Sequence, residues 1–305
     1  MRRRWKILLF GLCALIAIVA VCFVCFHKTE PSYNGRTLSE WLRPVTHPVS
    51  AQQWAKSEEA VRAIDAKAIP CLLTWIDERS RICEFLSHPL MPASVRHAMY
   101  AERLAAEVRA KHLMAIEGFR ILKTNAAPAL GELERRFNSE TDPQCASALG
   151  NAIGNLGGPA LKFLLGVIAA NPANFRARAA LAGIGEMKYL GTNAAEAVPV
   201  LLKQLQNTND WQGMRAASEA AGRLALMPVV IVPALTNMFA SSNLVVRRDA
   251  MRALYYLNDR ATMDVPKSFI RVALNDPDKQ VHFFATNLAR SFAPEFLTNK
   301  AGVNN

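Results

Sequence analysis

Arginine recurs at matching places in the second half of the sequence. Arg176, Arg215 and Arg247 each follow an apolar residue and come three positions before a small one. A guanidinium binds carboxylate and carbonyl oxygens through several hydrogen bonds at once, and arginine beside aromatic residues is typical of interfaces. We expect an acidic or carbonyl-rich partner to contact a set of eight residues. They are Arg176, Arg178, Trp211, Arg215, Arg247, Arg248, Arg252 and His282.

An alternative role for the same arginines is structural. Acidic residues stand in the turns and helices next to the series, at Asp210, Asp249, Asp276 and Asp278. Arginines at equivalent places in neighbouring units could bond to these acids or to turn carbonyls and hold the units together. The sequence leaves both roles open.

Motifs for catalysis or for binding a metal, a nucleotide or a cofactor were sought and not found. The sequence contains no H-E-x-x-H, G-x-S-x-G, Walker loop or EF-hand pattern. The glycines of "GNAIGNLGG" and "GIGEMKYLG" follow no predicted strand, and we expect them to end helices instead. His88 and His97 are nine residues apart, which is not a helical ligand pair. We predict no catalytic residue, metal or cofactor.

A repeated helical pattern must position the arginines. The template is "VRRDAMRAL", Val246–Leu254, and copies start at Phe175, Met214 and Val281, with weaker copies at Lys56, Lys111 and Gln144. The second residue of each copy, called here the anchor position, is Ser57, His112, Cys145, Arg176, Arg215, Arg247 and His282. Three residues later every copy has alanine or serine, which lets helix backbones approach closely. Apart from one longer interval, the spacing is that of a two-helix repeat.

A second helix is predicted between successive copies. Each of these segments contains a proline suited to the first turn of a helix, where its missing N–H has no intrahelical partner. The prolines are Pro70, Pro128, Pro159, Pro199, Pro233 and Pro266. Polar turns such as "NSETDP", "ANPAN", "NTND", "SSN" and "NDPD" supply N-caps for the template helices. The chain should therefore be all-α, a string of about seven helical hairpins.

These residues resemble the HEAT repeat, particularly its shorter bacterial form, over roughly 37–293. The likeness is strongest in "MPVVIVPALTNMFASSNLVVRRDAMRALYYL" and "DVPKSFIRVALNDPDKQVHFFATNLARSF". The resemblance implies an α-solenoid whose template helices line the concave surface, over residues 57–300. The chain is also similar to membrane-anchored bacterial HEAT proteins without an assigned activity, in which a segment like "YNGRTLSEWL" follows the anchor.

One interval is too long for the repeat. The 55 residues between Ser57 and His112 point to an insertion at about 79–110, within which 93–110 reads as an extra helix. Insertions in repeats emerge on one face and often belong to binding surfaces. The alternative is a lid over a hydrophobic gap.

The N-terminal residues predict a membrane anchor. Residues 7–26 carry no charge and follow Arg2, Arg3, Arg4 and Lys6, so 1–28 should be a cytoplasmic basic tip and one transmembrane helix. The rest would then lie outside the cytoplasm, in the periplasm of a cell with an inner membrane. The alternative is a cleaved signal peptide, for which the exit "VCFVCFHK" lacks a small-x-small site.

Charge narrows the class of possible partner, and the cysteine spacing indicates the state of the thiols. Residues 29–305 hold 31 basic and 25 acidic residues, a net charge of +6, so half of the +11 of the whole chain belongs to the first 28 residues. Nucleic acid is accordingly not expected. Cys71, Cys83 and Cys145 show no C-x-x-C spacing, which favours buried thiols, with a Cys71–Cys83 bridge as the alternative.

Residues 29–56 should link the anchor to the repeats and cap them. Thr37-Leu-Ser-Glu40 is a capping box, and Leu38, Trp41 and Leu42 fall on one helical face. We expect Trp41 to cover the first hairpin and to leave Tyr33 and Arg36 free.

The sequence therefore predicts a monomeric, membrane-tethered scaffold that binds a protein or peptide. The alternative is an enzyme or cofactor-handling protein, because some bacterial HEAT-like families resemble chromophore lyases. Cys83 and His88 would be its first candidate residues. A nucleic-acid-binding role would require the repeats to lie in the cytoplasm.

Overall fold

The computed structural model describes residues 30–46, 50–77, 100–207, 209–224, 228–258 and 265–298. Within these ranges the chain is helical apart from a two-stranded ribbon of β1 (Ser32–Tyr33) and β2 (Arg36–Thr37). No helix of the described ranges has both the length and the apolar character needed to cross a bilayer. The predicted anchor and the sites suggested at Cys83, His88 and His97 lie outside the described residues.

All seven template copies lie on α-helices, which confirms that part of the sequence prediction. We call these helices the inner row. They are α3 (Ala51–Ile64), α7 (Tyr100–Leu122), α9 (Pro143–Gly154), α11 (Phe175–Glu186), α13 (Trp211–Leu224), α15 (Leu244–Asn258) and α17 (Lys279–Phe292). The small residue three positions after each anchor is buried in every copy, between 0% and 7% exposed.

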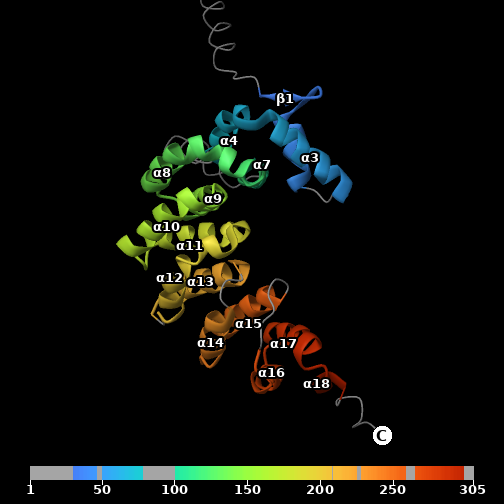
Figure 1. Cartoon of the computed structure of the whole chain (residues 1–305), viewed down its shortest axis with the longest axis vertical. Coiled ribbons are helices and arrows are strands. Elements are labelled where there is room, and N and C mark those ends of the chain that lie inside the picture. Colours follow the sequence, from blue (N-terminus) through green and yellow to red (C-terminus); the bar gives the residue numbers. More distant parts are fainter. Residues whose placement is uncertain are drawn as a thin grey trace, which may run out of the picture.

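The intervening helices form a second, outer row. They are α4 (Ile69–Ile76), α8 (Leu130–Ser139), α10 (Gly158–Ala170), α12 (Ala197–Leu205), α14 (Pro228–Phe239) and α16 (Lys267–Leu274). Each inner helix from α7 to α17 contacts the inner helix before it, and from α8 onward each outer helix packs on the inner helix that follows. Figure 1 shows the two rows curving together, with the inner row on the hollow side of the curve.

Short elements connect and close the rows. Four 3-10 segments lie at 43–46, 65–68, 123–129 and 187–194, and a last short helix, α18 (Glu295–Thr298), packs on α17. Asn34 and Gly35 have positive φ values of 49° and 75°, which places the Asn-Gly turn between β1 and β2.

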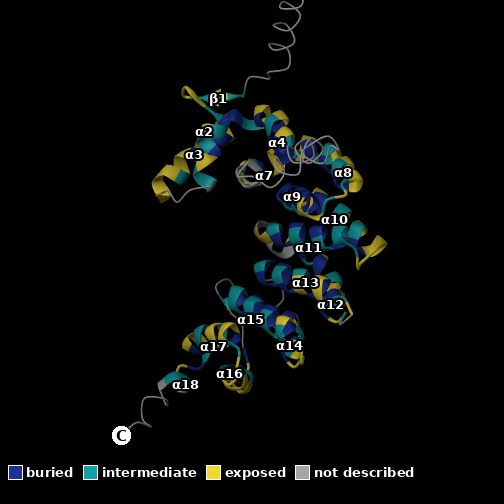
Figure 2. Ribbon diagram, turned by 180° about the vertical axis from the view of Figure 1, so that it is seen from behind, coloured by how far each residue is buried: buried dark blue, intermediate teal, exposed yellow. Residues whose placement is uncertain are grey.

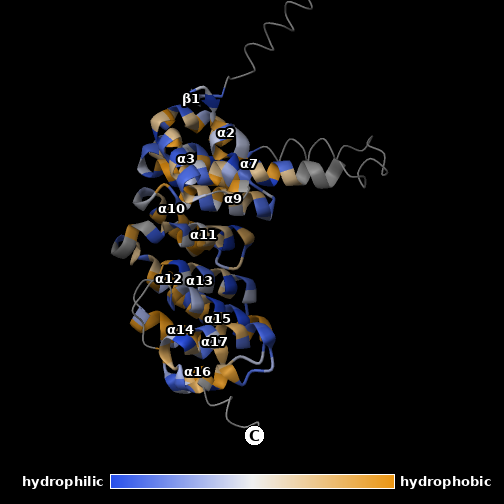
Figure 3. Cartoon of the chain, turned by 90° about the vertical axis from the view of Figure 1, so that its right-hand side faces the viewer, coloured by the Kyte–Doolittle hydropathy of each residue, from blue (hydrophilic) through white to orange (hydrophobic). Residues whose placement is uncertain are grey.

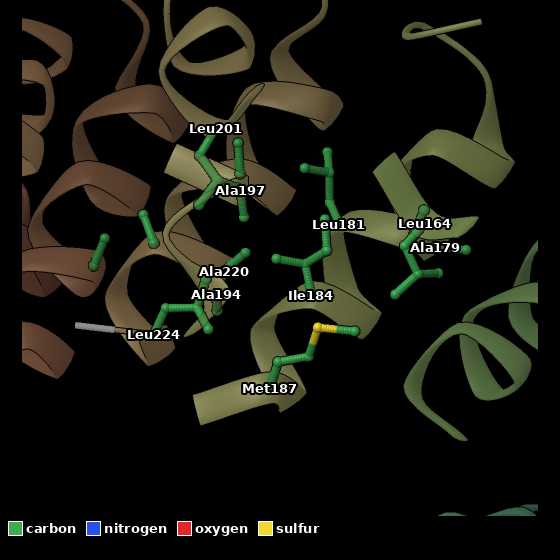
Figure 4. Close-up of a cluster of buried hydrophobic side chains, with 14 of the residues drawn as sticks. Leu164, Ala179, Leu181, Ile184, Met187, Ala194, Ala197, Leu201, Ala220 and Leu224 are labelled. Carbon is green, nitrogen blue, oxygen red and sulfur yellow. The ribbon is translucent and has the colours of Figure 1, made fainter. Parts of the chain in front are cut away.

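One continuous hydrophobic core runs through the stack, from Leu38 to Ala293. Figure 2 shows buried residues concentrated in α9, α11 and α13. In Figure 3 the helices carry both hydrophilic and hydrophobic residues, as expected when each is buried on one side. Figure 4 shows how the rows share this core, with Leu181 and Ile184 of α11 lying near Leu201 of α12 and Leu224 of α13.

The predicted N-caps are confirmed for the inner helices from α9 to α17. The carboxylate of Asp142 accepts hydrogen bonds from the backbone N–H of Gln144 and Cys145, and Asn174 caps α11 in the same manner. Asp210, Asn243 and Asp278 likewise accept from N–H groups in the first turns of α13, α15 and α17. Every polar turn named from the sequence therefore supplies a cap.

The predicted role of the prolines is only partly right. Pro70, Pro159 and Pro199 lie in the first turns of α4, α10 and α12. Pro233, in contrast, lies inside α14, because that helix begins at Pro228. Pro128 is in a 3-10 turn before α8, and Pro266 is the residue that precedes α16.

The prediction of a separate helix over 93–110 is wrong for the described residues. Residues 100–110 belong to α7, which continues without a break to Leu122. The residues from Tyr100 to Lys111 include no proline, glycine or capping residue that could end a helix. The template helix is simply longer in this unit.

Two helices approach each other through glycine. Gly150 and Gly154 lie in α9 and Gly183 in α11, and a Cβ atom on Gly183 would come within 2.8 Å of the carbonyl carbon of Gly150. All three permit close backbone contact. Gly150 and Gly183 lie inside their helices, so the expectation that they end helices is wrong for these two, whereas Gly154 is the last residue of α9. Gly157, with φ of 94°, does lie where α9 gives way to α10.

The N-terminal cap forms as predicted. The Thr37 hydroxyl accepts from the N–H of Glu40, and the Glu40 carboxylate accepts from the N–H of Thr37 at 2.8 Å, at the start of α2 (Leu38–Leu42). Trp41 packs against the core, and its indole N–H donates to the carbonyl of Tyr33 at 3.0 Å. Arg36 lies over the Trp41 ring at 4.3 Å. Tyr33 and Arg36 are therefore part of the cap, contrary to the expectation that they stay free.

Candidate binding groove on the inner row

Two anchor arginines bind the turns between units. Arg176 donates from Nη2 to the carbonyl of Glu140 at 2.7 Å. Arg247 donates from Nε to Asp276 at 2.9 Å and from Nη1 to the carbonyls of Ser241 and Ser242 at 3.2 and 3.0 Å. Both guanidinium groups bind groups of the turns between units. The role of holding neighbouring units together therefore accounts for both residues.

Arg178 and Arg248 bind the carboxylates that cap the next inner helix. Arg248 makes two hydrogen bonds to Asp278, of 3.0 and 2.5 Å. The Arg248 guanidinium and the backbone N–H groups of α17 hold the pKa of Asp278 at about 2. Arg178 forms an ion pair with Asp210 at 3.7 Å and a hydrogen bond to the side chain of Gln212. Each pair joins one unit to the following one.

Arg215 and Arg252 converge on a buried acid. Asp249 of α15 is 5% exposed and lies 3.7 Å from Arg215 and 3.4 Å from Arg252. Burial raises the pKa of Asp249, although both arginines act to lower it. Arg215 is 48% exposed, the most accessible of these arginines, so it remains a candidate contact for a partner.

Trp211 and His282 line separate pockets at the turn edge of the stack. Trp211, 44% exposed, borders a pocket of about 470 Å³ together with Met214 and Met238. His282 borders a pocket of about 380 Å³ with Arg271. The eight residues predicted from the sequence are thus divided among turn contacts, one acid cluster and two pockets.

A further pocket lies at the middle of the inner row, and we call it the groove pocket. It has a volume of about 210 Å³ and is lined by Ser147 and Asn151 of α9, Ala182 and Gly185 of α11, and Ala216, Glu219, Ala220 and Arg223 of α13. Since every lining residue belongs to the inner row and none to the outer row, the pocket opens on the hollow side of the curve.

Ion pairs between units border this pocket. The guanidinium of Arg223 donates to Glu186 of α11 and, at 2.7 Å, to Glu219 of its own helix. A matching arrangement stands three inner helices earlier, on α7, where Arg120 donates to Glu117 at 2.5 Å and to Glu58 of α3 at 2.7 Å. Burial raises the pKa of Glu117, and repulsion from Glu58 and Glu186 adds to it while Arg120 opposes it.

Sequence reasoning missed Arg120 and Arg223. Both stand eight residues after an anchor position, His112 and Arg215 respectively, so reading the template two turns further would have found them. Their acidic partners could not have been paired with them from the sequence, because Glu58 and Glu186 lie 62 and 37 residues away.

Tyr255 occupies the same template position on α15. Its ring lies 5.5 Å from Phe284 and 6.0 Å from Tyr256, and Phe283 beside them is 59% exposed. The inner row thus carries carboxylates and arginines around α7–α13 and aromatic rings around α15 and α17.

Within the described residues, no three His, Cys, Asp or Glu side chains are grouped as metal ligands. Cys145 is buried and Cys71 half-buried, and neither is in a disulfide there. Compared with known proteins, the chain matches no family model, and a search of curated proteins finds no similar sequence.

Proposed function

We propose that this chain is a membrane-tethered α-solenoid of about seven HEAT-like hairpins that binds a polypeptide segment along its inner row. The fold part of the proposal is supported by the two rows of helices, in which each unit contacts mainly its neighbours. Such an arrangement offers an extended surface rather than one deep site. The tether rests on the uncharged residues 7–26 and the basic residues before them.

The groove pocket is the observation that carries the binding role. Three successive units contribute to it, and its floor is made of alanine and glycine, so a partner's side chain can approach the helix backbones. Glu219 borders the pocket, and Arg215 lies on the same helix near it. Both charged side chains are accessible and can orient a partner. A polypeptide in extended or helical form suits such a surface.

Site-specific photocrosslinking in cells that express the full chain tests this role. A photoreactive amino acid would replace Ala216 or Ala182, which line the groove pocket from α13 and α11, or, as the control, the exposed Ala170 on outer helix α10. We expect one and the same protein to be crosslinked from both inner positions and not from Ala170. Equal capture at all three positions, or capture only at Ala170, would contradict the proposal.

A reporter enzyme that is active only outside the cytoplasm, fused after Asn305, tests the tether. Activity is expected because the basic residues before 7–26 should remain on the cytoplasmic side. An inactive fusion, together with activity of a second reporter that works only in the cytoplasm at the same position, would reverse the orientation and make a nucleic-acid partner the better explanation of the positive charge.

A further inference from the structure

The floor of the groove pocket suits a long apolar stem. Ala182, Gly185, Ala216 and Ala220 present no polar side-chain atom, and a Cβ on Gly185 would already lie 3.2 Å from the Cα of Ala220. Small residues therefore set the depth of the pocket. A side chain that reaches this floor lies between two helices and loses most of its contact with water.

The rim offers hydrogen-bond acceptors to a ligand. The side-chain oxygen of Asn151 is buried and has no hydrogen-bond partner among the described residues. Glu186 and Glu219 each bind Arg223 through Oε1, and within the same part of the chain their Oε2 atoms make no hydrogen bond. Three acceptor atoms thus remain for a ligand at or beside the pocket.

The ion pairs beside the pocket share their charges unequally. Glu186 and Glu219 share the single guanidinium of Arg223. In the earlier units Arg120 is bound to Glu117 and Glu58, and Arg62 also binds Glu58. Towards the C-terminus, Arg215 and Arg252 both face Asp249. At the pocket itself two carboxylates therefore share one arginine, which favours the approach of a further cation.

We propose that the groove pocket binds a basic side chain, lysine or arginine, of the polypeptide that docks on the inner row. This inference rests on the proposed function and names the chemistry of the partner. The aliphatic stem would lie on the alanine and glycine floor, and the cationic head would reach Glu219, Glu186 and the Asn151 oxygen. Lysine and arginine combine such a stem with such a head, and hydrogen bonds between charged groups are the stronger kind.

Fluorescence anisotropy with the full chain in non-ionic detergent tests this inference. The probes are three fluorescein-labelled nonapeptides of serine and glycine that differ only at the central residue, which is lysine, norleucine or glutamate. Norleucine matches the stem of lysine without its charge, and glutamate reverses the charge. We expect the lysine peptide to bind at least about tenfold more tightly than the other two.

Variants assign the binding to the pocket. Glu219→Gln keeps the shape of the side chain and removes its charge, and it should weaken binding of the lysine peptide about tenfold. Ala216→Leu should fill the pocket and abolish binding, whereas Ala170→Leu on the outer row should leave it unchanged. Far-UV circular dichroism would show that all three variants fold.

Four results would overturn the inference. They are preference for the glutamate peptide, equal binding of lysine and norleucine, unchanged binding by Ala216→Leu, and no binding of any peptide by the unmodified chain. If photocrosslinks at Ala182 nevertheless persist, a partner docks on the inner row without a basic side chain in this pocket. If the photocrosslinks are also lost, the proposed function itself fails.

Discussion

Replacing Gly183 with alanine probes the close backbone contact between α9 and α11. Gly183 lies in the middle of α11, and its added Cβ would meet the carbonyl carbon of Gly150 at 2.8 Å and a methyl group of Leu164 at 3.2 Å. The carbonyl oxygen of Gly150 would lie nearer still to the new Cβ than its carbon does. Favourable contacts between carbon atoms lie at about 3.5–4.0 Å, so α9 and α11 would have to separate by roughly an ångström. Backbone atoms cannot rotate away as a flexible side chain can.

The size of the effect follows from two opposing terms. Overpacking costs up to about 3 kcal/mol, and the upper end applies because the obstacle is backbone. Alanine in a helix interior gains about 1 kcal/mol over glycine. The net loss should therefore be about 2 kcal/mol. At roughly 2–4 °C per kcal/mol, this lowers Tm by about 4–8 °C.

Gly166 provides the matched control. It lies inside outer helix α10, and a Cβ there would meet nothing within 4 Å. Gly166→Ala should keep the gain in helix propensity without the clash and raise Tm by about 2–4 °C. Thermal unfolding followed by circular dichroism at 222 nm, with the full chain in detergent, measures both variants. If Gly183→Ala is as stable as the unmodified chain, or if both variants shift Tm in one direction, the reasoning about close backbone contact is refuted.

Three further predictions concern polar contacts. Arg247→Ala should lower the free energy of unfolding in urea by about 2–3 kcal/mol, because it removes a charged hydrogen bond from a largely buried acid. Arg215 is half-exposed, so Arg215→Ala should change that free energy by no more than about 0.5 kcal/mol. Equal losses in the two variants would contradict the turn-binding role of Arg247. The folded pKa of Asp278, about 2, lies below its ordinary value of 3.8, so its contribution to stability is complete above that value and is lost as the pH falls to about 2. Asp278→Asn should therefore lower Tm at neutral pH and have no effect at about pH 2; a Tm difference independent of pH would exclude this linkage. Thr37→Ala should remove the cap of α2 and speed hydrogen exchange at the Glu40 amide about fivefold, as a loss of about 1 kcal/mol implies; unchanged exchange would show that the cap contributes nothing.

The inner row could be predicted because one local rule fixes it. An apolar residue before the anchor and a small residue three positions after it must face the same core, and Val246 and Ala250 are 6% and 0% exposed, as that rule requires. The caps could be predicted for a similar reason, because their hydrogen bonds are local. Asp142 and Asp278 each accept from N–H groups only two and three residues later in the chain.

The errors arose where two local signals competed. The segment "MPVVIVP" contains Pro228 and Pro233, and either can start a helix. The structure starts α14 at Pro228 and accepts Pro233 inside it. In α7 the repeat spacing suggested a boundary at Ala110. The residues from Tyr100 to Lys111 include no proline, glycine or capping residue, and this local continuity outweighs a spacing rule.

The candidate site could be predicted only in part, because its contacts are non-local. Arginine at the anchor position pointed to a binding surface, yet Arg176 and Arg247 are occupied by turn groups. The groove pocket depends on Gly185, whose role is visible only once Ala220 of the next unit is seen beside it. Spacing along one chain carries no information about such cross-unit distances.

Four of the arginine pairs run in one direction along the chain. Arg178, Arg215, Arg247 and Arg248 each bind an acid of the following unit, respectively Asp210, Asp249, Asp276 and Asp278. During synthesis the N-terminal units emerge and fold first. Every one of these carboxylates therefore leaves the ribosome after the cation that neutralises it is already in place. At these four junctions the growing end of the protein would present guanidinium groups, which repel one another, rather than an acid still waiting for its cation. The later acid can then be neutralised as soon as its own hairpin packs onto the stack.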